Sequence, residues 1–429
     1  LLSLKNNINI QKDNDKLRKE INSLKDQLNQ NEKILEKLEN PKKQELIEQI
    51  LKTNFEQIMG LYENTKKEIE IKDKKIEAIE YLDKEKLSKT QKENYDSLGE
   101  EIIRNGKYAV VTMAGGQGTR WGHTGPKGTF KLDVYGKGKY LFEIIVENLK
   151  EANEKYKTTI PWYIMTSREN HDETKTFLEK HKYFGYDKNY VEIVTQKELP
   201  LISEDGKILI SKEYKIKEAS DGNGGTYSSL RNCGCLADMK ERGVKWIFIG
   251  SVDNALLKMD GTTLIAMAVD KKVQIASKSV VKANPKERVG VFCKLNGHPK
   301  VIEYTELPEK MAEERDNNGE LRYGESHIMC NLYTIEAVEK ISNEPLIYHS
   351  AHKKNSYINE DGKEIIPEEP NSYKFESFIF DAFEIFDDIA ILRGKREDDF
   401  APVKNKEGVD SPKTAKELYE KFWNKARKI

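Results

Sequence analysis

Two basic side chains, Arg120 and Lys127, stand inside a glycine-rich stretch, VVTMAGGQGTRWGHTGPKGTF, which spans residues 110–130. Glycine tolerates positive φ and lets the backbone approach a ligand closely, so the amide N–H groups of such a loop can converge on phosphate oxygens. The guanidinium of Arg120 can bind an anion through two parallel hydrogen bonds, and the ammonium of Lys127 supplies a compact charge. The chemistry that these residues suit is the binding of a polyphosphate. The alternative is a glycine-rich surface turn with incidental charges.

Two familiar phosphate-binding motifs do not fit this stretch. A dinucleotide fingerprint would require a glycine at position 121, after Gly116 and Gly118, and Trp121 stands there. A Walker A loop would require Gly-Lys-Ser/Thr, but Lys127 is followed by Gly128. If the loop binds phosphate, it does so by a different pattern.

The residues around the loop predict an α/β sheet. From Tyr108 onward, β-rich runs (YAVVTM, PWYIMTS, YVEIVTQ, VKWIFIGSVDN and later IAILRG) alternate with amphipathic runs such as LFEIIVENLKEA and HDETKTFLEKH. This alternation favours a mostly parallel sheet with helices on both faces. We expect one helix over TYSSLRNCGCLADMKERG, added strands within residues 273–304, and helices over 374–386 and 412–427. The glycine loop follows the first strand, so it is expected at the carboxyl edge of the sheet, where such sheets bind ligands.

The N-terminal 40 residues predict a helix of another kind. Apolar residues recur at alternating three- and four-residue spacing and form a heptad seam, in which Asn14 and Asn31 occupy two positions. We expect a coiled coil that joins copies of the chain into a homo-oligomer; the alternative is one amphipathic helix packed on the body. Asn40-Pro41 breaks this helix, and a second helical stretch, KKQELIEQILKTNFEQIMGLYENTKKEI, follows. The apolar members of the seam are Ile10, Leu17, Ile21, Leu24, Leu28, Leu35 and Leu38.

Composition argues against several classes of partner. The 429 residues include 72 basic and 73 acidic ones, with a net charge of −1, so nothing favours whole-chain binding to nucleic acid or to an anionic membrane. No apolar run approaches the ~20 residues of a membrane span. The four cysteines form no CxxC pair, and we expect buried free thiols in a reducing, cytoplasmic environment.

The loop AGGQGTRWGHTGPKG resembles the G-x-G-T-R-x-G…P-K-G signature of the nucleotidyltransferases that make nucleotide sugars. Seven further blocks occur in order and at fitting spacing: TQKELP, SDGNGGTYSSL, GSVDNALLK, KANPKERVGVFCKLNG, VIEYTEL, FESFIFDAF and REDDFAPVKN. Together they resemble the eukaryotic-type UDP-sugar pyrophosphorylases (UDPGP type 1), and especially the branch that makes UDP-N-acetylglucosamine. The resemblance covers about residues 45 to 427.

This resemblance implies a fold and a reaction. We expect an N-terminal helical region over 41–105, a Rossmann-like (GT-A-like) nucleotidyltransferase domain with a mixed sheet over 106–395, and a short C-terminal segment over 396–429. The coiled-coil helix over residues 1–40 is expected from the heptad seam alone, because the resemblance does not extend to it. The implied reaction joins UTP and a sugar 1-phosphate, foremost N-acetylglucosamine 1-phosphate, into a UDP-sugar and pyrophosphate, with Mg²⁺ as cofactor. Neither nucleic acid nor membrane is expected as a partner.

The nucleotide side of the site combines charge with backbone contacts. Arg120 and Lys127 suit the UTP phosphates, and amides of Gly115 and Gly116 surround the nucleotide. The resemblance implies that Gln196 and the backbone of Gly222 read the uracil edge, since a glutamine amide donates and accepts at once.

The remaining roles concern the metal and the sugar phosphate. Asp253 ends the run WIFIGSVDN, where one carboxylate could hold Mg²⁺ together with phosphates and waters. Lys404, in APVKN, is the implied clamp on the sugar phosphate. A turn-capping Asp253, a surface Lys404 and aromatic side chains that belong to the core are the alternatives. The implied sugar contacts are Asn223, Gly290, Glu303, His327, Phe378 and Phe380.

One block departs from the pattern of this branch. Where the N-acetylglucosamine branch reads Gly-Asn-x-x-x-His, this chain reads SHIMCNL, with Ser326, His327 and Asn331. The ending NL resembles the UDP-glucose branch, so UTP-glucose-1-phosphate uridylyltransferase is the alternative function. A coiled-coil structural protein with a degenerate transferase body is a remote alternative, because the chain keeps Arg120, Lys127, Asp253 and Lys404.

Overall fold

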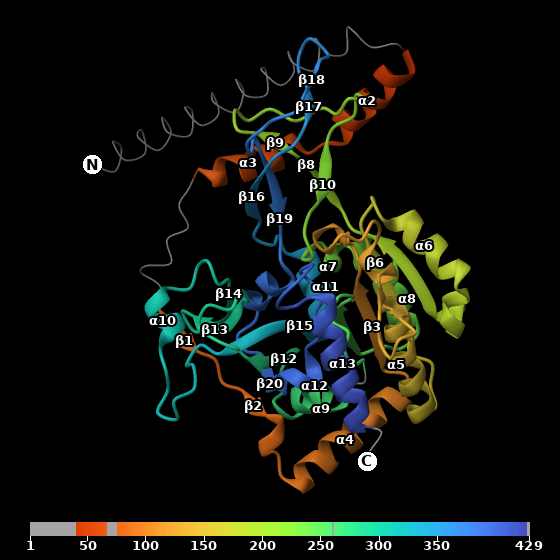
Figure 1. Cartoon of the computed structure of the whole chain (residues 1–429), viewed down its shortest axis with the longest axis vertical. Helices are drawn as coiled ribbons and strands as arrows, with labels where there is room; N and C mark the ends of the chain where they lie inside the picture. Colours follow the sequence, from red (N-terminus) through yellow and green to blue (C-terminus); the bar gives the residue numbers. More distant parts are fainter. Residues whose placement is uncertain (1–39, 67–74, 260, 427–429) are drawn as a thin grey trace, which may run out of the picture. The chain divides into compact units, whose positions relative to one another are not determined.

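The computed structural model describes residues 40–66, 75–259 and 261–426 (Figure 1). Contacts within the chain divide them into two compact units. The smaller unit combines the described residues before 70 with 198–222 and 348–377, and the larger unit holds the rest. This division differs from the expected ranges: the described residues 75–105 belong with the large sheet, and two segments inside 106–395 belong with the N-terminal helices.

A mixed sheet organises the larger unit. Its main path runs β2-β20-β12-β15-β11-β3-β6-β7, with β13 pairing β15, β1 and β14 beside it. β3, β6, β7 and β11 are mutually parallel, whereas β15 runs antiparallel to β11 and β12. The strands are β1 Ile76–Ala78, β2 Leu82–Asp83, β3 Tyr108–Met113, β6 Trp162–Thr166, β7 Val191–Thr195, β11 Trp246–Ser251, β12 Ile275–Val281, β13 Val291–Leu295, β14 His298–Ile302, β15 Glu325–Thr334 and β20 Ala390–Arg393.

Helices cover this sheet, and two of them, α4 and α9, lie side by side (Figure 1). Ser88 begins α4 with a capping box, in which its hydroxyl accepts from Gln91 N and the Gln91 side chain accepts from Ser88 N. The α-helices are α4 Lys89–Arg104, α5 Leu141–Tyr156, α6 His171–Lys180, α7 Gly225–Asn232, α8 Cys235–Glu241, α9 Thr262–Asp270, α10 Glu309–Glu313, α11 Ile335–Asn343, α12 Arg396–Asp399 and α13 Pro412–Ala426. Short 3₁₀ helices include η2 Thr119–Trp121, η3 Lys127–Thr129 and η6 Ile379–Ile385. A small hairpin joins β4 Lys131–Leu132 and β5 Lys139–Tyr140.

The central strands read as apolar runs because both faces of the sheet are covered. All six residues of β3 are buried, as are the first five of β11. Since β3, β6, β7 and β11 are parallel, their carboxyl ends meet at one edge of the sheet. The loops that leave this edge therefore carry the side chains that can act together.

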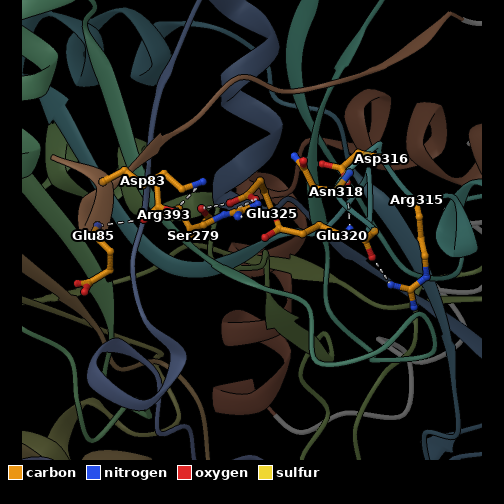
Figure 2. A network of polar contacts seen from close by, with 11 residues as sticks. Asp83, Glu85, Ser279, Arg315, Asp316, Asn318, Glu320, Glu325 and Arg393 are labelled. Atoms are coloured by element: carbon orange, nitrogen blue, oxygen red, sulfur yellow. Dashed lines mark hydrogen bonds and ion pairs between the residues drawn. The ribbon is translucent and has the colours of Figure 1, made fainter.

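A buried ionic network ties β20, β12 and β15 together at the same edge (Figure 2). Arg393 Nε donates to Glu325 Oε1 at 2.8 Å, and its Nη1 donates to Glu320 Oε2 at 2.8 Å. The hydroxyl of Ser279 donates to Glu325 Oε2 at 2.5 Å. The guanidinium also lies 3.7 Å from the ring centre of Tyr81. The network fixes the end of β20, from which the chain continues into α12.

The smaller unit has a core of its own. The helices α2 Asn40–Lys52 and α3 Phe55–Thr65 pack with three short sheets around Leu46, Ile58 and Phe375. The strands are β8 Glu198–Pro200, β9 Ile202–Ser203, β10 Glu218–Ser220, β16 His349–Lys353, β17 Tyr357–Ile358, β18 Glu364–Ile365 and β19 Ser372–Glu376.

The structure corrects several expectations from the sequence. The expected helix over 226–243 is two helices, because Gly234 adopts φ 80° between them. Residues 374–386 form the end of β19 and the 3₁₀ helix η6 rather than one α-helix. Of the four free cysteines, Cys233 is exposed, contrary to expectation, and the other three are buried. The helices expected over 171–181 and 412–427 are confirmed as α6 His171–Lys180 and α13 Pro412–Ala426.

Two further expectations concern the N-terminal heptad seam and the absence of a membrane span. The heptad seam lies outside the described residues. In the described part of the chain, no helix has the length and apolar character that a membrane crossing requires.

Candidate active site

The glycine-rich loop leaves β3 and returns to its own start. Gly116 O accepts from Lys127 N at 3.0 Å, and Gly118 N donates to Gly125 O at 3.0 Å. Arg120 lies exposed on η2, and Gly116 is exposed as well. The loop therefore presents backbone and a guanidinium to solvent while its base is fixed.

Lys127 reaches from this loop to the end of β11. Its Nζ donates to Asp253 Oδ2 at 2.8 Å, and the hydroxyl of Ser251 donates to Asp253 Oδ1 at 2.8 Å. Asp253 is 8% exposed. The two residues expected to handle the reacting phosphate and the metal are thus in direct contact.

Asp253 is held as a carboxylate. Burial by itself would raise its pKa, but the charges of Lys127 and Lys404, with hydrogen bonds from Lys127 and Ser251, hold the pKa below its ordinary value. Lys404 therefore lies close enough to act on this carboxylate, although it follows Asp253 by about 150 residues. The expected catalytic residues Lys127, Asp253 and Lys404 form one charge cluster.

Gln196 lies against the glycine loop. Its backbone N donates to Thr166 O at 2.7 Å, at the carboxyl ends of β6 and β7. A Cβ added at Gly115 would lie 2.3 Å from Gln196 Oε1, so only glycine leaves room for this amide. The structure thus brings together Gly115 and Gln196, two of the four residues that were expected to contact the nucleotide.

Gly222 belongs to the smaller unit. It adopts φ 87°, and a Cβ there would lie 2.2 Å from Ser377 O, so the position requires glycine. Its role at the uracil edge stays a prediction.

The expected sugar contacts also gather. Gly290 O accepts from His327 N at 2.9 Å, and a Cβ at Gly290 would lie 3.5 Å from Glu303 Oε1. The His327 ring meets Phe380 edge-on at 5.5 Å, and Phe380 stacks on Phe378 at 5.1 Å. These four segments therefore surround one region of the larger unit.

Asn223 joins this group through the backbone. Its Oδ1 accepts from Ile379 N at 2.7 Å, which places Asn223 beside the two aromatic residues that flank Ile379. Phe378 lies in extended backbone just before η6, so the i, i+2 spacing allows the two rings to stack. Phe380 is 6% exposed and belongs to a hydrophobic core cluster. For this ring, the alternative that the aromatic side chain is part of the core is therefore correct.

His327 is buried and neutral. Burial lowers its pKa to about 4, although a hydrogen bond with the Asn331 Oδ1 acceptor raises the pKa, and the charge of Lys404 lowers it further. His327 Nε2 lies 3.0 Å from Asn331 Oδ1, which also accepts from Ser277 Oγ at 2.7 Å. Lys404 thus lies near both Asp253 and the sugar region.

A bulge in β15 makes this pairing possible. His327 faces Ser279 and Asn331 faces Ser277, so four residues of β15 span two of β12. Met329 adopts φ 58° within the bulge. Residues four apart in a regular strand would lie about 13 Å apart, beyond the reach of a hydrogen bond.

Sequence reasoning missed several positioning residues. Ser251 binds the Asp253 carboxylate, and Asn331 binds His327. Asn170 Nδ2 donates to Ala114 O at 3.0 Å, while its Oδ1 accepts from Ser167 N at 2.9 Å. The sequence marks these residues only by their position next to the motifs. Their contacts could not be predicted, because they join distant parts of the chain or lie in irregular backbone.

The residues present fit a magnesium ion that takes one carboxylate from the protein and most of its other ligands from substrate phosphates and water. Asp253 offers one ionised carboxylate, and each of its oxygens has lone pairs beyond the hydrogen bond that it accepts. Within the described ranges, no group of three or more His, Cys, Asp or Glu side chains could hold a metal. Mg²⁺ is commonly held by one or two carboxylates plus substrate phosphates and waters, which matches this donor set.

Comparison with known proteins decides the family. The model of the family described as UTP–glucose-1-phosphate uridylyltransferase (UDPGP) matches residues 52–410. The chain belongs to this family. The matched range includes the glycine loop, Asp253 and Lys404.

Individual relatives of the UDPGP chain are more specific. It is 36% identical over 353 residues to UDP-N-acetylglucosamine diphosphorylase 2 of Arabidopsis thaliana, covering 78% of this chain and 68% of the relative. It is 35% identical over 349 residues to UDP-N-acetylglucosamine pyrophosphorylase of Saccharomyces cerevisiae, covering 78% and 73%. The uridine diphosphate N-acetylglucosamine pyrophosphorylase structure from Trypanosoma brucei superposes with a TM-score of 0.77 at 27% identity, covering 90% of this chain and 80% of that chain.

Proposed function

We propose that this protein is a uridylyltransferase that makes UDP-N-acetylglucosamine and pyrophosphate from UTP and N-acetylglucosamine 1-phosphate. An oxygen of the sugar phosphate attacks the α-phosphorus of UTP in line. The new P–O bond forms as the bond to the bridging α–β oxygen breaks, and pyrophosphate leaves with that electron pair. The nucleophile is already an anion, so no general base is needed, and catalysis is positioning and charge neutralisation.

The charged residues have distinct parts in this reaction. Arg120 and Lys127 neutralise the UTP phosphates, and Lys404 holds the phosphate of the sugar. Asp253 fixes Lys127 and would hold Mg²⁺, which would supply positive charge that offsets the charge of the phosphates. Lys127 can serve both the carboxylate and a phosphate because an ammonium has three donors.

The observation that supports this proposal is the charge cluster at the carboxyl edge of the sheet. Lys127 contacts Asp253 directly, and Lys404 acts on the same carboxylate. The cluster holds two cations for one buried carboxylate, so it carries positive charge beyond what pairing with Asp253 requires, and this charge is available to a phosphate.

A panel of sugar 1-phosphates tests the function. We expect pyrophosphate release from UTP with N-acetylglucosamine 1-phosphate as the preferred acceptor. Glucose 1-phosphate is expected to react as well, with a preference of no more than ~10²-fold in kcat/KM, the scale of a few kcal/mol. If glucose 1-phosphate is the better acceptor, the protein is a UTP-glucose-1-phosphate uridylyltransferase instead.

His327 is the reason for expecting a modest preference. It contacts Gly290 and Phe380, and it replaces the asparagine of the N-acetylglucosamine branch with a larger ring. His327→Asn should raise the preference for the acetamido sugar. Because Asn331 is paired with His327, exchanging both residues would preserve the hydrogen-bonded pair in the opposite order.

We also propose that residues 1–40 form a coiled coil that joins copies of the chain, and that the reaction takes place in the cytoplasm. The support is the Ile/Leu heptad seam and the free state of the described cysteines.

A further inference from the structure

Asn254, the residue after the proposed metal-binding Asp253, bonds to a segment almost 150 residues later. Its Nδ2 donates to Asp399 O at 2.8 Å, and its Oδ1 accepts from Ala401 N at 2.8 Å and from Leu256 N at 3.1 Å. Backbone donors and acceptors cannot exchange roles, so these contacts fix the orientation of the amide. Asn254 is 4% exposed, and its carboxamide serves three backbone groups at once.

A short antiparallel pairing extends these contacts. Asn254 pairs with Pro402, Ala255 N donates to Ala401 O at 3.0 Å, and Val403 N donates to Asp253 O at 2.8 Å. Lys404 is the next residue. The register of this pairing therefore sets how far the Lys404 ammonium stands from the Asp253 carboxylate.

A buried ion pair anchors the far side of the segment. Lys278 Nζ, on β12, lies 3.3 Å from Asp399 Oδ1, and the two side chains are 9% and 5% exposed. A Cβ at Gly394 would lie 2.2 Å from Asp399 Oδ2, so the glycine at the end of β20 makes room for this carboxylate. Lys404 itself is only partly buried, and its Nζ lies 5.3 Å from the ring centre of Phe400.

We propose that Asn254 is a positioning residue that sets the distance between the nucleotide side of the site, at Asp253 and Lys127, and the sugar-phosphate side, at Lys404. The inference rests on the proposed function. The reaction requires UTP and the sugar phosphate to come within bonding distance, and the lysines proposed to bind them lie on segments that are far apart in the chain. A buried amide directly after Asp253 joins these two segments. Misplacement of a reacting group by ~1 Å can cost about 10²-fold in rate.

The test is a double-mutant cycle between Asn254→Ala and Lys404→Ala. Asn254→Ala should raise the KM for N-acetylglucosamine 1-phosphate and lower kcat, with a loss of about 10-fold or more in kcat/KM, while the KM for UTP changes little. If Asn254 acts by placing Lys404, its effect should largely vanish in the Lys404→Ala background, because coupled residues are not additive.

Asn153→Ala supplies the matched control. Asn153 also bonds a backbone amide, since its Oδ1 accepts from Ile160 N at 3.0 Å, and its Nδ2 donates to Tyr186 Oη at 3.1 Å. It lies at the end of α5, outside the site. We expect it to lower the thermal unfolding midpoint without changing the KM for the sugar phosphate.

Each outcome decides the matter. If the wild type is active and the fold-losses in kcat/KM from Asn254→Ala and Lys404→Ala simply multiply in the double variant, the two residues are not coupled. That result overturns this inference alone. The same holds if Asn153→Ala raises the sugar-phosphate KM as much as Asn254→Ala does, because general destabilisation would then explain both. A wild type that transfers no uridylyl group to any sugar phosphate overturns the proposed function and this inference with it.

Discussion

At the scale of single residues, the site depends on how buried side chains keep or lose their charge. Asp253 stays ionised in spite of burial because two lysines surround it, whereas His327 is neutral because burial dominates its surroundings. The two groups share Lys404 as a neighbour. The charge of Lys404 stabilises the carboxylate and opposes protonation of the imidazole, which makes it the residue that connects the two halves of the site.

Asp253→Asn tests the metal and phosphate role directly. The variant keeps the shape of the side chain and the contact with Ser251, so we expect it to fold. Turnover should fall by at least ~10², the scale of one lost electrostatic stabiliser. Steady-state rates at saturating Mg²⁺, with thermal unfolding as the check on folding, provide the measurement. Near-normal turnover in the folded variant would refute the assignment.

His327 predicts a dependence of stability on pH. Its folded-state pKa is about 4, below the ordinary value near 6.5, so the unfolded chain binds the proton more readily. Its contribution to stability is therefore complete above pH ~6.5 and is lost as the pH falls toward ~4. Between pH 7 and pH 5 we expect a loss of about 2 kcal/mol in the free energy of unfolding from this group.

Urea unfolding of the wild type and of His327→Asn at both pH values measures this loss. The variant should lack this part of the pH dependence. NMR titration of the His327 ring in the folded protein gives an independent reading, and titration near pH 6.5 would contradict the account.

At the scale of elements, the glycine loop and the ends of four parallel strands assemble the nucleotide side. The loop follows β3, Asp253 follows β11, and Gln196 follows β7, all at one edge of the sheet. Gly115 closely approaches Gln196, so a side chain at position 115 would occupy the space of the Gln196 amide.

Gly115→Ala should therefore weaken nucleotide binding selectively. The added Cβ would lie 2.3 Å from Gln196 Oε1, which is the end of a flexible side chain and can move away. We expect a small change in stability and a KM for UTP raised by about 10-fold, the equivalent of one lost hydrogen bond. The KM for the sugar phosphate serves as the internal control. Equal increases in both KM values would argue against a nucleobase role for Gln196.

Sequence patterns predicted the elements better than their interruptions. The apolar runs of β3 and β11 and the residues just beyond them were predictable because alternation and position determine where such loops lie. The break at Gly234, the bulge at Met329 and the bonds of Asn254 were not, because each depends on backbone conformation or on partners far away in the chain. The large mixed α/β sheet was predicted; the recruitment of 198–222 and 348–377 into a second unit was not.

At the scale of the whole molecule, the chain combines two compact units with an N-terminal heptad pattern. The larger unit holds every expected site residue except Gly222. Substitutions within this unit can therefore test the proposed reaction. The N-terminal pattern supports the proposed association between copies, which can be tested separately from the reaction.

Sedimentation equilibrium tests the proposed self-association. The full chain should have the mass of an oligomer, whereas a truncated variant that begins at Asn40 should sediment as a smaller species, because the Ile/Leu seam is then absent. Full-length Asn14→Ile should strengthen association, since polar residues at seam positions cost stability. Equal masses for the full chain and the truncated variant would rule the coiled coil out.

The central claim is transfer of the uridylyl group, and ³¹P NMR of the reaction mixture tests it most directly. With UTP, N-acetylglucosamine 1-phosphate and Mg²⁺, the account predicts that the sugar-phosphate monoester signal is replaced by the two coupled signals of a diphosphate ester. Pyrophosphate should appear in equal amount, and added pyrophosphate should reverse the reaction. Hydrolysis of UTP to UDP and orthophosphate, or an unchanged monoester signal in the presence of folded protein, would contradict it.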